Sequence, residues 1–555
     1  MPVRKVVLIN PRCPADFLNS SVINQALGKT TFFPSLSLLT IAALTPKEQF
    51  EVEIFDEYLG KSVEEAVPDA DIYGMTCYDP NRGRAHEICR WLKARGKFVV
   101  LGGPHASQHF RAIAEDEPYD VVFAGDAELT WPRFLSEWLQ GAHQPLYVEE
   151  EKVDLKHTPV ASWDMVPRGR YLSALLQTTR GCPYRCDFCD AIVLYGNKVR
   201  TKPVDKVIEE LDLIYKAGFQ TVFLGDDNFT AARGYAKQVL RRVAEWRKDK
   251  DPLFVLGTQL SIDIARDDEL LELMTRAGLV FVYLGIESSS EDALRHANKL
   301  QNLKSDMRAD VEKLHSYGIN VMSGLIVGFD QDGPDIFGRH AEFCEELGIP
   351  ACVSYILTAP YGTPLRKRLE EEGRIDGDYT LGELLKTNII PKRMSAADLM
   401  EGYRWMTTRL FEYDGFVRRL KKKYGVFRAK GIATAGTMTA KIRARHYLMG
   451  WRILAFMATH PGQSRDLAAL FAKVLPVMLE RPAFINDIFL DLMIFIRFKT
   501  YYDKTGVYSE DLRQAPDPGT WIKEQQPPAA APLPLPPDAA LPVPDPAARP
   551  GIATA

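Results

Sequence analysis

The stretch Thr179-Arg180-Gly181-Cys182-Pro183-Tyr184-Arg185-Cys186-Asp187-Phe188-Cys189 decides how this chain of 555 residues folds. It holds three of the eight cysteines at the spacing CxxxCxxC, while the other five are scattered singly. Chance would place three cysteines at one fixed spacing in roughly 0.002 of such chains. Three thiolates with no nearby fourth Cys or His make a poor structural zinc site. They suit an iron–sulfur cluster that leaves one iron open.

Apolar runs and amphipathic segments alternate on the carboxyl side of this motif. The alternation continues for about 200 residues, which predicts a full or partial parallel barrel whose chemistry lies at the carboxyl ends of its strands. The cysteine motif follows the first of these strands directly. The six predicted strands are residues 174–176, 221–224, 254–256, 281–284, 322–327 and 351–355.

A second alternation precedes the motif and predicts a doubly wound parallel sheet. Its five predicted strands are residues 6–9, 52–55, 71–75, 98–101 and 120–123. Ligands of such sheets lie at the carboxyl ends of the strands. Two of these ends carry Gly102-Gly103-Pro104-His105 and Gly125-Asp126-Ala127-Glu128. Glycines there let backbone amides approach a ligand, and a purely structural turn is an equal alternative.

Composition places the chain among ordinary soluble proteins of three or four domains. It is 46% hydrophobic and 26% charged, which excludes a disordered chain or a bundle of membrane spans. The 69 Lys and Arg against 73 Asp and Glu argue against a protein that coats nucleic acid. Sparse cysteines and the lack of an apolar leader predict a reducing, cytoplasmic location.

The cysteine motif closely resembles that of the radical S-adenosylmethionine (SAM) enzymes, including the aromatic Phe188 before the last cysteine. The resemblance implies that Cys182, Cys186 and Cys189 hold a four-iron four-sulfur (4Fe-4S) cluster, and that Phe188 lies at the cofactors. The free iron would chelate SAM, and an electron from the cluster would release a 5′-deoxyadenosyl radical. An external one-electron reductant is then required.

Later strand ends add to the resemblance. Gly225, Asp226 and Asp227 stand where the family places groups near the amino end of SAM. Glu287 and Ser288 resemble the family's strand-end motif near the ribose and carboxylate. Acidic residues and glycines also cap strands for turn geometry, so each motif alone is weak.

The upstream sheet resembles the cobalamin-binding domain that is often fused to these enzymes. The loop at residues 10–17 lacks the DxHxxG histidine that ligates cobalt from below, although cobalamin-dependent radical enzymes often lack it. A purely structural or substrate-binding sheet therefore stays an alternative. The resemblance implies cobalamin contacts from Gly102, Gly103, His105, Gly125 and Glu128.

Beyond about Arg374 helical periodicity replaces the strand signal. Residues 415–465 hold twelve Lys and Arg and no acid, interleaved from Tyr447 to Met457 with aromatic and apolar side chains. Such a segment suits peripheral contact with an anionic membrane, at about 1 kcal/mol per basic residue. The alternative is a helical cap that packs on the barrel. No RNA or DNA module is recognisable, so no nucleic-acid partner is expected.

These observations predict an α/β protein in four parts. They are a Rossmann-like, doubly wound cobalamin-binding domain (1–155), a partial (β/α)6 radical SAM barrel (165–375), a mainly helical C-terminal domain (376–510) and a Pro/Ala-rich disordered tail (511–555).

The arrangement resembles the subgroup of cobalamin-binding radical SAM proteins that contains hopanoid C-2 methylases. That resemblance implies a C-methyltransferase for a small-molecule substrate, such as a polycyclic lipid. The sequence identifies no catalytic residue that touches the substrate. Two other functions stay open: a radical SAM cyclase or rearrangement enzyme without methyl transfer, and a non-catalytic iron–sulfur electron carrier.

Overall fold

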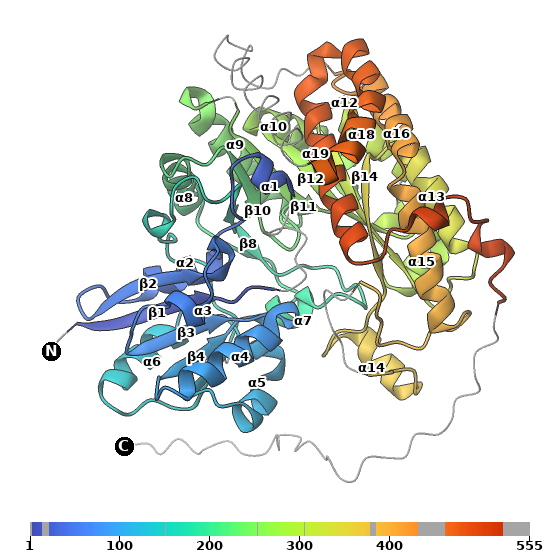
Figure 1. The fold of residues 1–555 in the computed structure, drawn as a ribbon. Coiled ribbons are helices and arrows are strands. Elements are labelled where there is room, and N and C mark those ends of the chain that lie inside the picture. The colour runs from blue at the N-terminus through green and yellow to red at the C-terminus, as the bar shows by residue number, and fades with distance from the viewer. Residues whose placement is uncertain are drawn as a thin grey trace, which may run out of the picture.

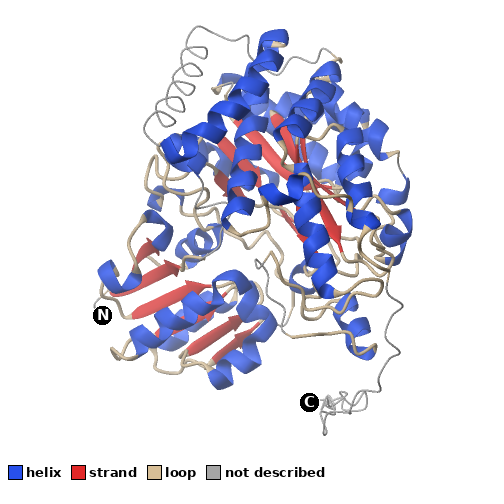
Figure 2. Cartoon of the chain, turned by 45° about the vertical axis from the view of Figure 1, so that its right-hand side comes forward, coloured by secondary structure: helices blue, strands red, loops and turns tan. Residues whose placement is uncertain are grey.

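The computed structural model describes residues 3–13, 22–149, 151–251, 253–304, 306–377, 384–430 and 461–524. Two six-stranded parallel sheets lie one after the other along the chain, and a group of helices covers the second (Figures 1 and 2). The predicted α/β fold class is confirmed, with a helical C-terminal part. The exact domain boundaries stay predictions.

The first sheet has the strand order β2-β1-β3-β4-β5-β6. Its strands are β1 (Arg4–Asn10), β2 (Phe50–Asp56), β3 (Ile72–Thr76), β4 (Val99–Gly102), β5 (Val121–Ala124) and β6 (Leu146–Val148). The first five match the prediction, and the sixth is an edge strand of three residues that the sequence did not reveal. We call this sheet and its helices the N-terminal lobe.

Helices cover both faces of the first sheet because its strands are apolar on both sides. In β1, Val7 and Ile9 pack in one core cluster and Val6 and Leu8 in the other. Helices α3 (Val63–Ala66), α4 (Arg82–Lys93) and α5 (Pro104–Asp116) supply the first cluster. Helices α2 (Leu36–Leu44) and α6 (Thr130–Leu139) supply the second.

The second sheet has the order β14-β13-β12-β11-β10-β7, and it is a partial barrel since β7 and β14 are its two edges. Its strands are β7 (Ala174–Leu176), β10 (Thr221–Leu224), β11 (Val255–Leu260), β12 (Leu279–Glu287), β13 (Asn320–Val327) and β14 (Ala351–Ile356). All six were predicted. The intervening helices are α8 (Val204–Lys216), α9 (Arg233–Trp246), α10 (Asp268–Ala277), α11 (Glu291–His296), α12 (Met307–Ser316) and α13 (Ile336–Leu347).

A short antiparallel pair, β8 (Thr179–Arg180) and β9 (Arg200–Thr201), follows β7. The sequence did not predict this pair, because two-residue strands carry no periodicity. The chain between its strands contains the cysteine motif and then α7 (Ala191–Tyr195). We call residues 181–199 the cysteine loop.

The helical C-terminal part contains α14 (Pro364–Glu371), α15 (Ala396–Leu410), α16 (Tyr413–Val426), α18 (Pro461–Glu480) and α19 (Ile485–Lys504). Its apolar side chains join the core of the barrel. Among the described helices, none combines the length and the apolar composition that crossing a lipid bilayer requires. Remaining helices are α1 (Val22–Ala26), η1 (Glu57–Leu59), η2 (Asp79–Asn81), η3 (Trp163–Met165), η4 (Arg247–Asp249), η5 (Ile262–Arg266), η6 (Asn302–Lys304), η7 (Pro482–Phe484), η8 (Glu510–Arg513) and η9 (Pro518–Thr520).

The beginning of the predicted disordered tail is packed, which corrects that prediction for residues 511–524. Trp405 donates its indole N–H to the carbonyl of Ala515 at 3.0 Å, and Ile522 is buried. These residues precede the proline-rich stretch, and the Ala515 carbonyl accepts from side chains of α15. Residues 525–555 lie outside the described part of the chain.

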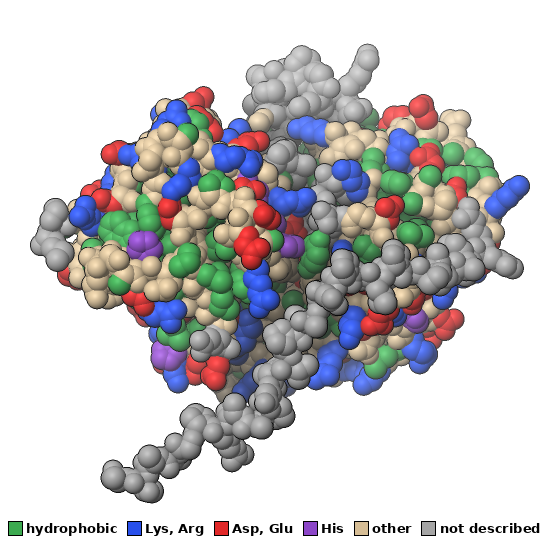
Figure 3. Space-filling model, turned by 90° about the horizontal axis from the view of Figure 1, so that it is seen from below, with side chains coloured by type: hydrophobic (Ala, Val, Ile, Leu, Met, Phe, Trp, Pro, Cys, Tyr) green, Lys and Arg blue, Asp and Glu red, His purple; other side chains and the backbone are tan. Residues whose placement is uncertain are grey.

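The basic segment of the C-terminal part is neutralised by acids from elsewhere in the fold. Arg419 pairs with Glu345 of α13 at 2.9 Å, and Lys423 pairs with Asp491 of α19 at 2.6 Å. On the face seen in Figure 3, acidic and basic side chains are interspersed. The described half therefore forms the helical cap. Residues 431–460, with the predicted aromatic mixture, lie outside the described residues, and membrane contact stays a prediction.

Candidate active site

The three cysteines lie on the cysteine loop, at the carboxyl end of β7. The loop begins at Gly181, whose φ of +88° suits glycine, and a Cβ there would meet the carbonyl oxygen of Lys198 at 2.5 Å. The Gly181 N–H donates to Asp227 Oδ2 at 2.7 Å, and the Cys182 N–H donates to the carbonyl of Gly196 at 3.3 Å. The first cysteine is thus held by backbone contacts at both ends of the loop.

Segments outside the cysteine loop hold Cys186 and its neighbour Asp187. The Asp187 N–H donates to the carbonyl of Ala297 at 3.1 Å, and the Asp187 carbonyl accepts from the Leu365 N–H at 3.0 Å. Gln301 Nε2 donates to the Cys186 sulfur at 3.6 Å. Phe188 packs edge-on against Phe329, with ring centroids 5.8 Å apart, so it anchors the loop on the barrel.

The three thiols form a donor set that suits a cluster better than one metal ion. Burial raises the pKa of all three thiols, to about 12 for Cys189, and the charge of Cys186 raises the other two further. Bound metal is what would hold such thiols as thiolates. Two sulfurs on one zinc ion lie roughly 4 Å apart. These three do not all come within 4.8 Å of one another, which argues against a single ion. Three thiolates that leave one iron open are the donor set of a 4Fe-4S cluster.

Asp226 shapes the backbone that carries the cysteines. Its carboxylate is fully buried and accepts from the N–H groups of Thr178, at 2.6 Å, and Thr179, at 2.9 Å, and from the Thr178 hydroxyl. Burial raises the pKa of Asp226, and that of Asp227, to about 6. These bonds engage both oxygens of Asp226. Direct cofactor contacts of Gly225, Asp226 and Asp227 stay predictions.

Glu287, at the end of β12, forms a buried ion pair with Lys299 at 2.8 Å. Its backbone has a φ of +66°, which is uncommon for a non-glycine residue. Burial lowers the pKa of Lys299, but the charges of Glu287 and of the Cys186 thiol outweigh it, so that the pKa is raised. Lys299 is a site residue that the sequence did not reveal, since no motif spacing marks it. The Ser288 hydroxyl accepts from the Ser290 N–H at 3.1 Å, which makes a turn.

A cavity of about 610 Å³ lies between the N-terminal lobe and the barrel. Four of the five predicted cobalamin contacts line it, together with Gly225 from the barrel. It extends along the face of the first sheet that α2 and α6 cover, where Leu8, Phe123 and Trp131 form apolar walls. The predicted residues in its lining are Gly102, Gly103, Gly125, Glu128 and Gly225.

The glycines at this edge are also required by the backbone. Gly103 has a φ of +100°, and a Cβ there would lie 2.7 Å from the backbone of Cys77. Gly125 has a φ of +94°, and its Cβ would lie 2.5 Å from the side chain of Glu149. The backbone geometry supports the structural interpretation of these glycines, and their contact with cobalamin stays a prediction.

His105 is absent from the lining of this cavity. Its Nδ1 lies 2.5 Å from Oδ1 of Asp79, and both side chains are buried. With His109 they form a group whose ligand atoms lie within 4.8 Å of one another. The 2.5 Å between His105 Nδ1 and Asp79 Oδ1 is the distance of a hydrogen bond. Two ligand atoms on one metal ion would lie roughly 3 Å apart. The structure gives no support to the predicted contact of His105 with cobalamin.

Comparisons with known proteins agree with this geometry. Residues 176–344 match the radical SAM superfamily model, and residues 363–506 match a domain of unknown function, DUF4070. An uncharacterized methyltransferase of Synechocystis sp. is 31% identical over 420 residues, which cover 75% of this chain and 77% of that protein. The chain belongs to the radical SAM superfamily. The match implies a 4Fe-4S cluster and SAM as cofactors, as predicted, and the relatives make this radical SAM protein an enzyme of the methyltransferase type.

Another relative and two solved structures extend the comparison. The hopanoid C-2 methylase of Rhodopseudomonas palustris is 31% identical over 353 residues, or 62% of this chain and 66% of that protein. The cobalamin-dependent SAM radical enzyme OxsB has a TM-score of 0.57 at 18% identity, covering 94% of this chain and 84% of that one. The radical SAM methyltransferase TsrM of Kitasatospora setae has a TM-score of 0.54 at 17% identity, covering 69% and 80%. At these identities the two structures show the shared fold.

Proposed function

We propose that this radical SAM protein is a cobalamin-dependent methyltransferase that acts on an unactivated carbon. The observation that carries the proposal is the cavity of about 610 Å³, because residues of both lobes line it. Apolar walls with a few polar groups at the rim suit a large, mostly rigid cofactor. The relatives named as methyltransferases and the aqua-cobalamin bound to OxsB support the same conclusion.

Two groups of residues would bind two different cofactors. Cys182, Cys186 and Cys189 would hold the cluster, and Gly102, Gly103 and Gly125 would let cobalamin approach the edge of the first sheet. When bound, the cluster with SAM supplies a radical that removes a hydrogen atom, and cobalamin supplies the methyl group.

The buried pair of Lys299 and Glu287 contributes a fixed positive charge beside the cysteines. Lys299 places a buried positive charge beside the thiols of Cys186 and Cys189. A fixed charge in a site of low dielectric favours the anionic ligands of the cluster more than the same charge would in water. Glu287 holds the ammonium group of Lys299 in place.

A polycyclic lipid such as a hopanoid is the substrate that we propose. The hopanoid C-2 methylase among the relatives supports it. A second cavity of about 230 Å³ opens beside α7, where Val148 and Val193 are exposed at 39% and 37%. Leu194 and Tyr361 continue this apolar lining next to the cysteine loop. A peripheral position at the inner face of the membrane would bring the enzyme to such a substrate.

Product analysis tests the proposal. The enzyme, purified without oxygen in the presence of cobalamin, is incubated with SAM, a one-electron reductant and a hopanoid. Methyl transfer predicts a methylated product with S-adenosylhomocysteine and 5′-deoxyadenosine in equal amounts. Deoxyadenosine without S-adenosylhomocysteine would favour a cyclase or rearrangement enzyme. Absence of both products in enzyme that contains its cluster and cobalamin would favour an electron carrier.

A further inference from the structure

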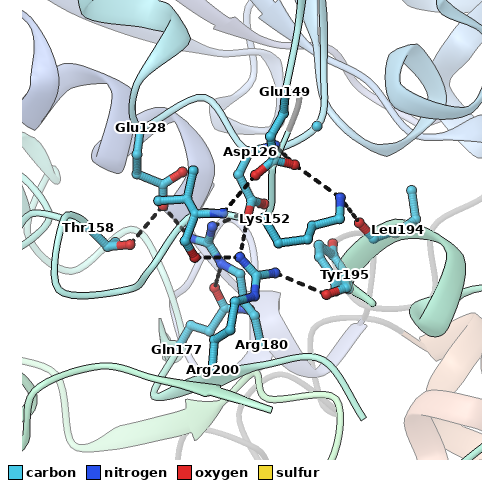
Figure 4. A network of polar contacts seen from close by, with 12 residues as sticks. Asp126, Glu128, Glu149, Lys152, Thr158, Gln177, Arg180, Leu194, Tyr195 and Arg200 are labelled. Carbon is cyan, nitrogen blue, oxygen red and sulfur yellow. Dashed lines mark hydrogen bonds and ion pairs between the residues drawn. The ribbon is translucent and has the colours of Figure 1, made fainter. Parts of the chain in front are cut away.

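The two ends of the cysteine loop are fastened to a single carboxylate of the N-terminal lobe. Arg180 and Arg200 pair with each other in the β8–β9 ladder, immediately before and after the loop. Arg180 Nη1 lies 3.1 Å from Asp126 Oδ1, and Arg200 Nη1 lies 2.6 Å from Asp126 Oδ2. Figure 4 shows both guanidinium groups pointing at the loop that follows β5. Asp126 therefore bridges β8 and β9, the two strands that flank the cysteine loop.

Further contacts fix both arginines in this position. Arg180 Nη2 lies 2.7 Å from Glu128 Oε1, and Arg180 Nε donates to Gln177 Oε1 at 2.7 Å. Arg200 donates to the carbonyls of Val153, at 2.7 Å, and Tyr195, at 3.1 Å. Glu128 in turn accepts from the Thr158 hydroxyl (Figure 4). Two positive and two negative charges balance one another in this network.

The network is buried, so water screens its ion pairs little. The side chains of Arg180, Asp126, Arg200 and Glu128 are exposed by 12% or less. Burial raises the pKa of Asp126, but the charges of Arg180 and Arg200 lower it more, so the net pKa is below its usual range. Removing one partner of a buried ion pair leaves an uncompensated buried charge, which is strongly destabilising.

The same side chains face the cofactor cavity. Asp126, Glu128 and Arg180 all contribute to its lining. A molecule that fills the cavity would therefore lie against the groups that hold the cysteine loop.

We infer that Asp126 is a positioning residue for the iron–sulfur cluster. It holds both ends of the cysteine loop through Arg180 and Arg200, and it couples occupancy of the cavity to the geometry of the three cysteines. The coupling to cobalamin rests on the proposed function, whereas the anchoring of the loop does not. Coupling of this kind is reciprocal: cobalamin stabilises the cluster site, and the cluster site favours cobalamin.

Iron release tests the anchoring. The full chain is reconstituted without oxygen, and a ferrous chelator removes iron while the visible absorption of the cluster is followed. Asp126→Asn is expected to lose its cluster about 10-fold faster than the unaltered protein, because one buried contact to each arginine is weakened. Asp205→Asn is the matched control, since Asp205 meets Arg242 at the surface and its side chain is 85% exposed. Equal rates for Asp126→Asn and the unaltered protein would overturn the anchoring.

A second variant keeps the test decisive if Asp126→Asn does not fold. Arg200→Lys preserves the charge and removes the fork that contacts Asp126 and two carbonyls. It is expected to release iron several-fold faster, and an unchanged rate in this variant would also overturn the anchoring. Far-ultraviolet circular dichroism establishes that each variant is folded.

Added hydroxocobalamin tests the coupling. It is expected to slow iron release from the unaltered protein by about 5-fold or more and to protect Asp126→Asn less. Equal protection of the two proteins, or binding of cobalamin without any protection, would overturn the coupling. No binding of cobalamin to the unaltered protein would instead contradict the proposed function and leave the anchoring to be decided by the first experiment.

Discussion

At the scale of single residues, Lys299 and Glu287 form a buried ion pair beside the cysteines. Lys299→Met leaves the Glu287 carboxylate buried without its cation, and we expect a loss of about 3 kcal/mol of unfolding free energy. Urea unfolding of the metal-free protein measures it apart from any effect on the cluster.

The control for this prediction is the surface pair of Lys248 and Glu245, whose side chains are 62% and 69% exposed. Lys248→Met should change the unfolding free energy by no more than about 0.5 kcal/mol. The double variant Lys299→Met with Glu287→Gln should recover part of the loss. Equal effects of the two lysine substitutions would show that the buried pair has no special role.

His340, in α13, predicts a pH dependence of stability. Its ring is buried, its Nδ1 lies 2.9 Å from the Ser289 hydroxyl, and burial lowers its pKa to about 4. The unfolded chain binds a proton near pH 6.5, so stability is lost as the pH falls from about 6.5 to 4, by up to about 3 kcal/mol. His340→Gln should flatten this part of the stability–pH profile.

The His340 prediction is tested by a difference measurement and by a control variant. Buried carboxylic acids with raised pKa, such as Asp56 and Asp332, change stability in the opposite sense, so the difference between variant and unaltered protein is the quantity to follow. His157→Gln, at an exposed position, should leave the profile unchanged. A profile that His340→Gln does not alter would contradict the lowered pKa.

At the scale of elements, the cysteine loop depends on the backbone of Gly181. Gly181→Ala places a methyl group 2.5 Å from the carbonyl oxygen of Lys198 and strains a φ of +88°. We expect this variant to fold but to retain less than half of its iron after reconstitution. Gly234→Ala, in α9, meets no atom within 4 Å and should stabilise the protein by about 0.5–1 kcal/mol. Full iron content in Gly181→Ala would show that the cysteine loop does not need the backbone conformation of Gly181 at its start.

The elements of the two sheets were predictable because short, mainly apolar strands alternate with amphipathic helical segments along the chain. The strands that escaped prediction are short: β6 has three residues, and β8 and β9 have two each. Their pairing depends on partners brought close by the fold. The importance of β8 and β9 comes from their position on either side of the cysteine loop, which no local pattern signals.

The candidate site was predictable where chemistry depends on spacing, as in the three cysteines. It was not predictable where chemistry depends on distant partners. Lys299 meets Glu287 from beyond α11, 12 positions along the chain, and Arg180 meets Asp126 from another lobe. The partners of the basic segment were not predictable for the same reason, because Glu345 and Asp491, which pair with Arg419 and Lys423, lie 68 or more positions away in the chain.

At the scale of the whole molecule, the N-terminal lobe and the barrel meet at the carboxyl ends of their strands. Ligands of parallel sheets lie at these ends, so the meeting of two such edges creates one shared chamber. Arg180, Arg200 and Tyr171 cross the interface, and Tyr171 donates to Asp56 at 2.8 Å. If both cofactors bind as proposed, this arrangement explains why the two lobes occupy a single chain.

Mössbauer spectroscopy of protein reconstituted with ⁵⁷Fe, recorded with and without SAM, tests the cluster most directly. We expect about four irons per chain in one cubane cluster, with SAM changing the signal of one iron site, and no cluster in Cys186→Ala. Two irons per chain, a mononuclear iron signal, or a four-iron spectrum that SAM leaves unchanged would contradict this expectation.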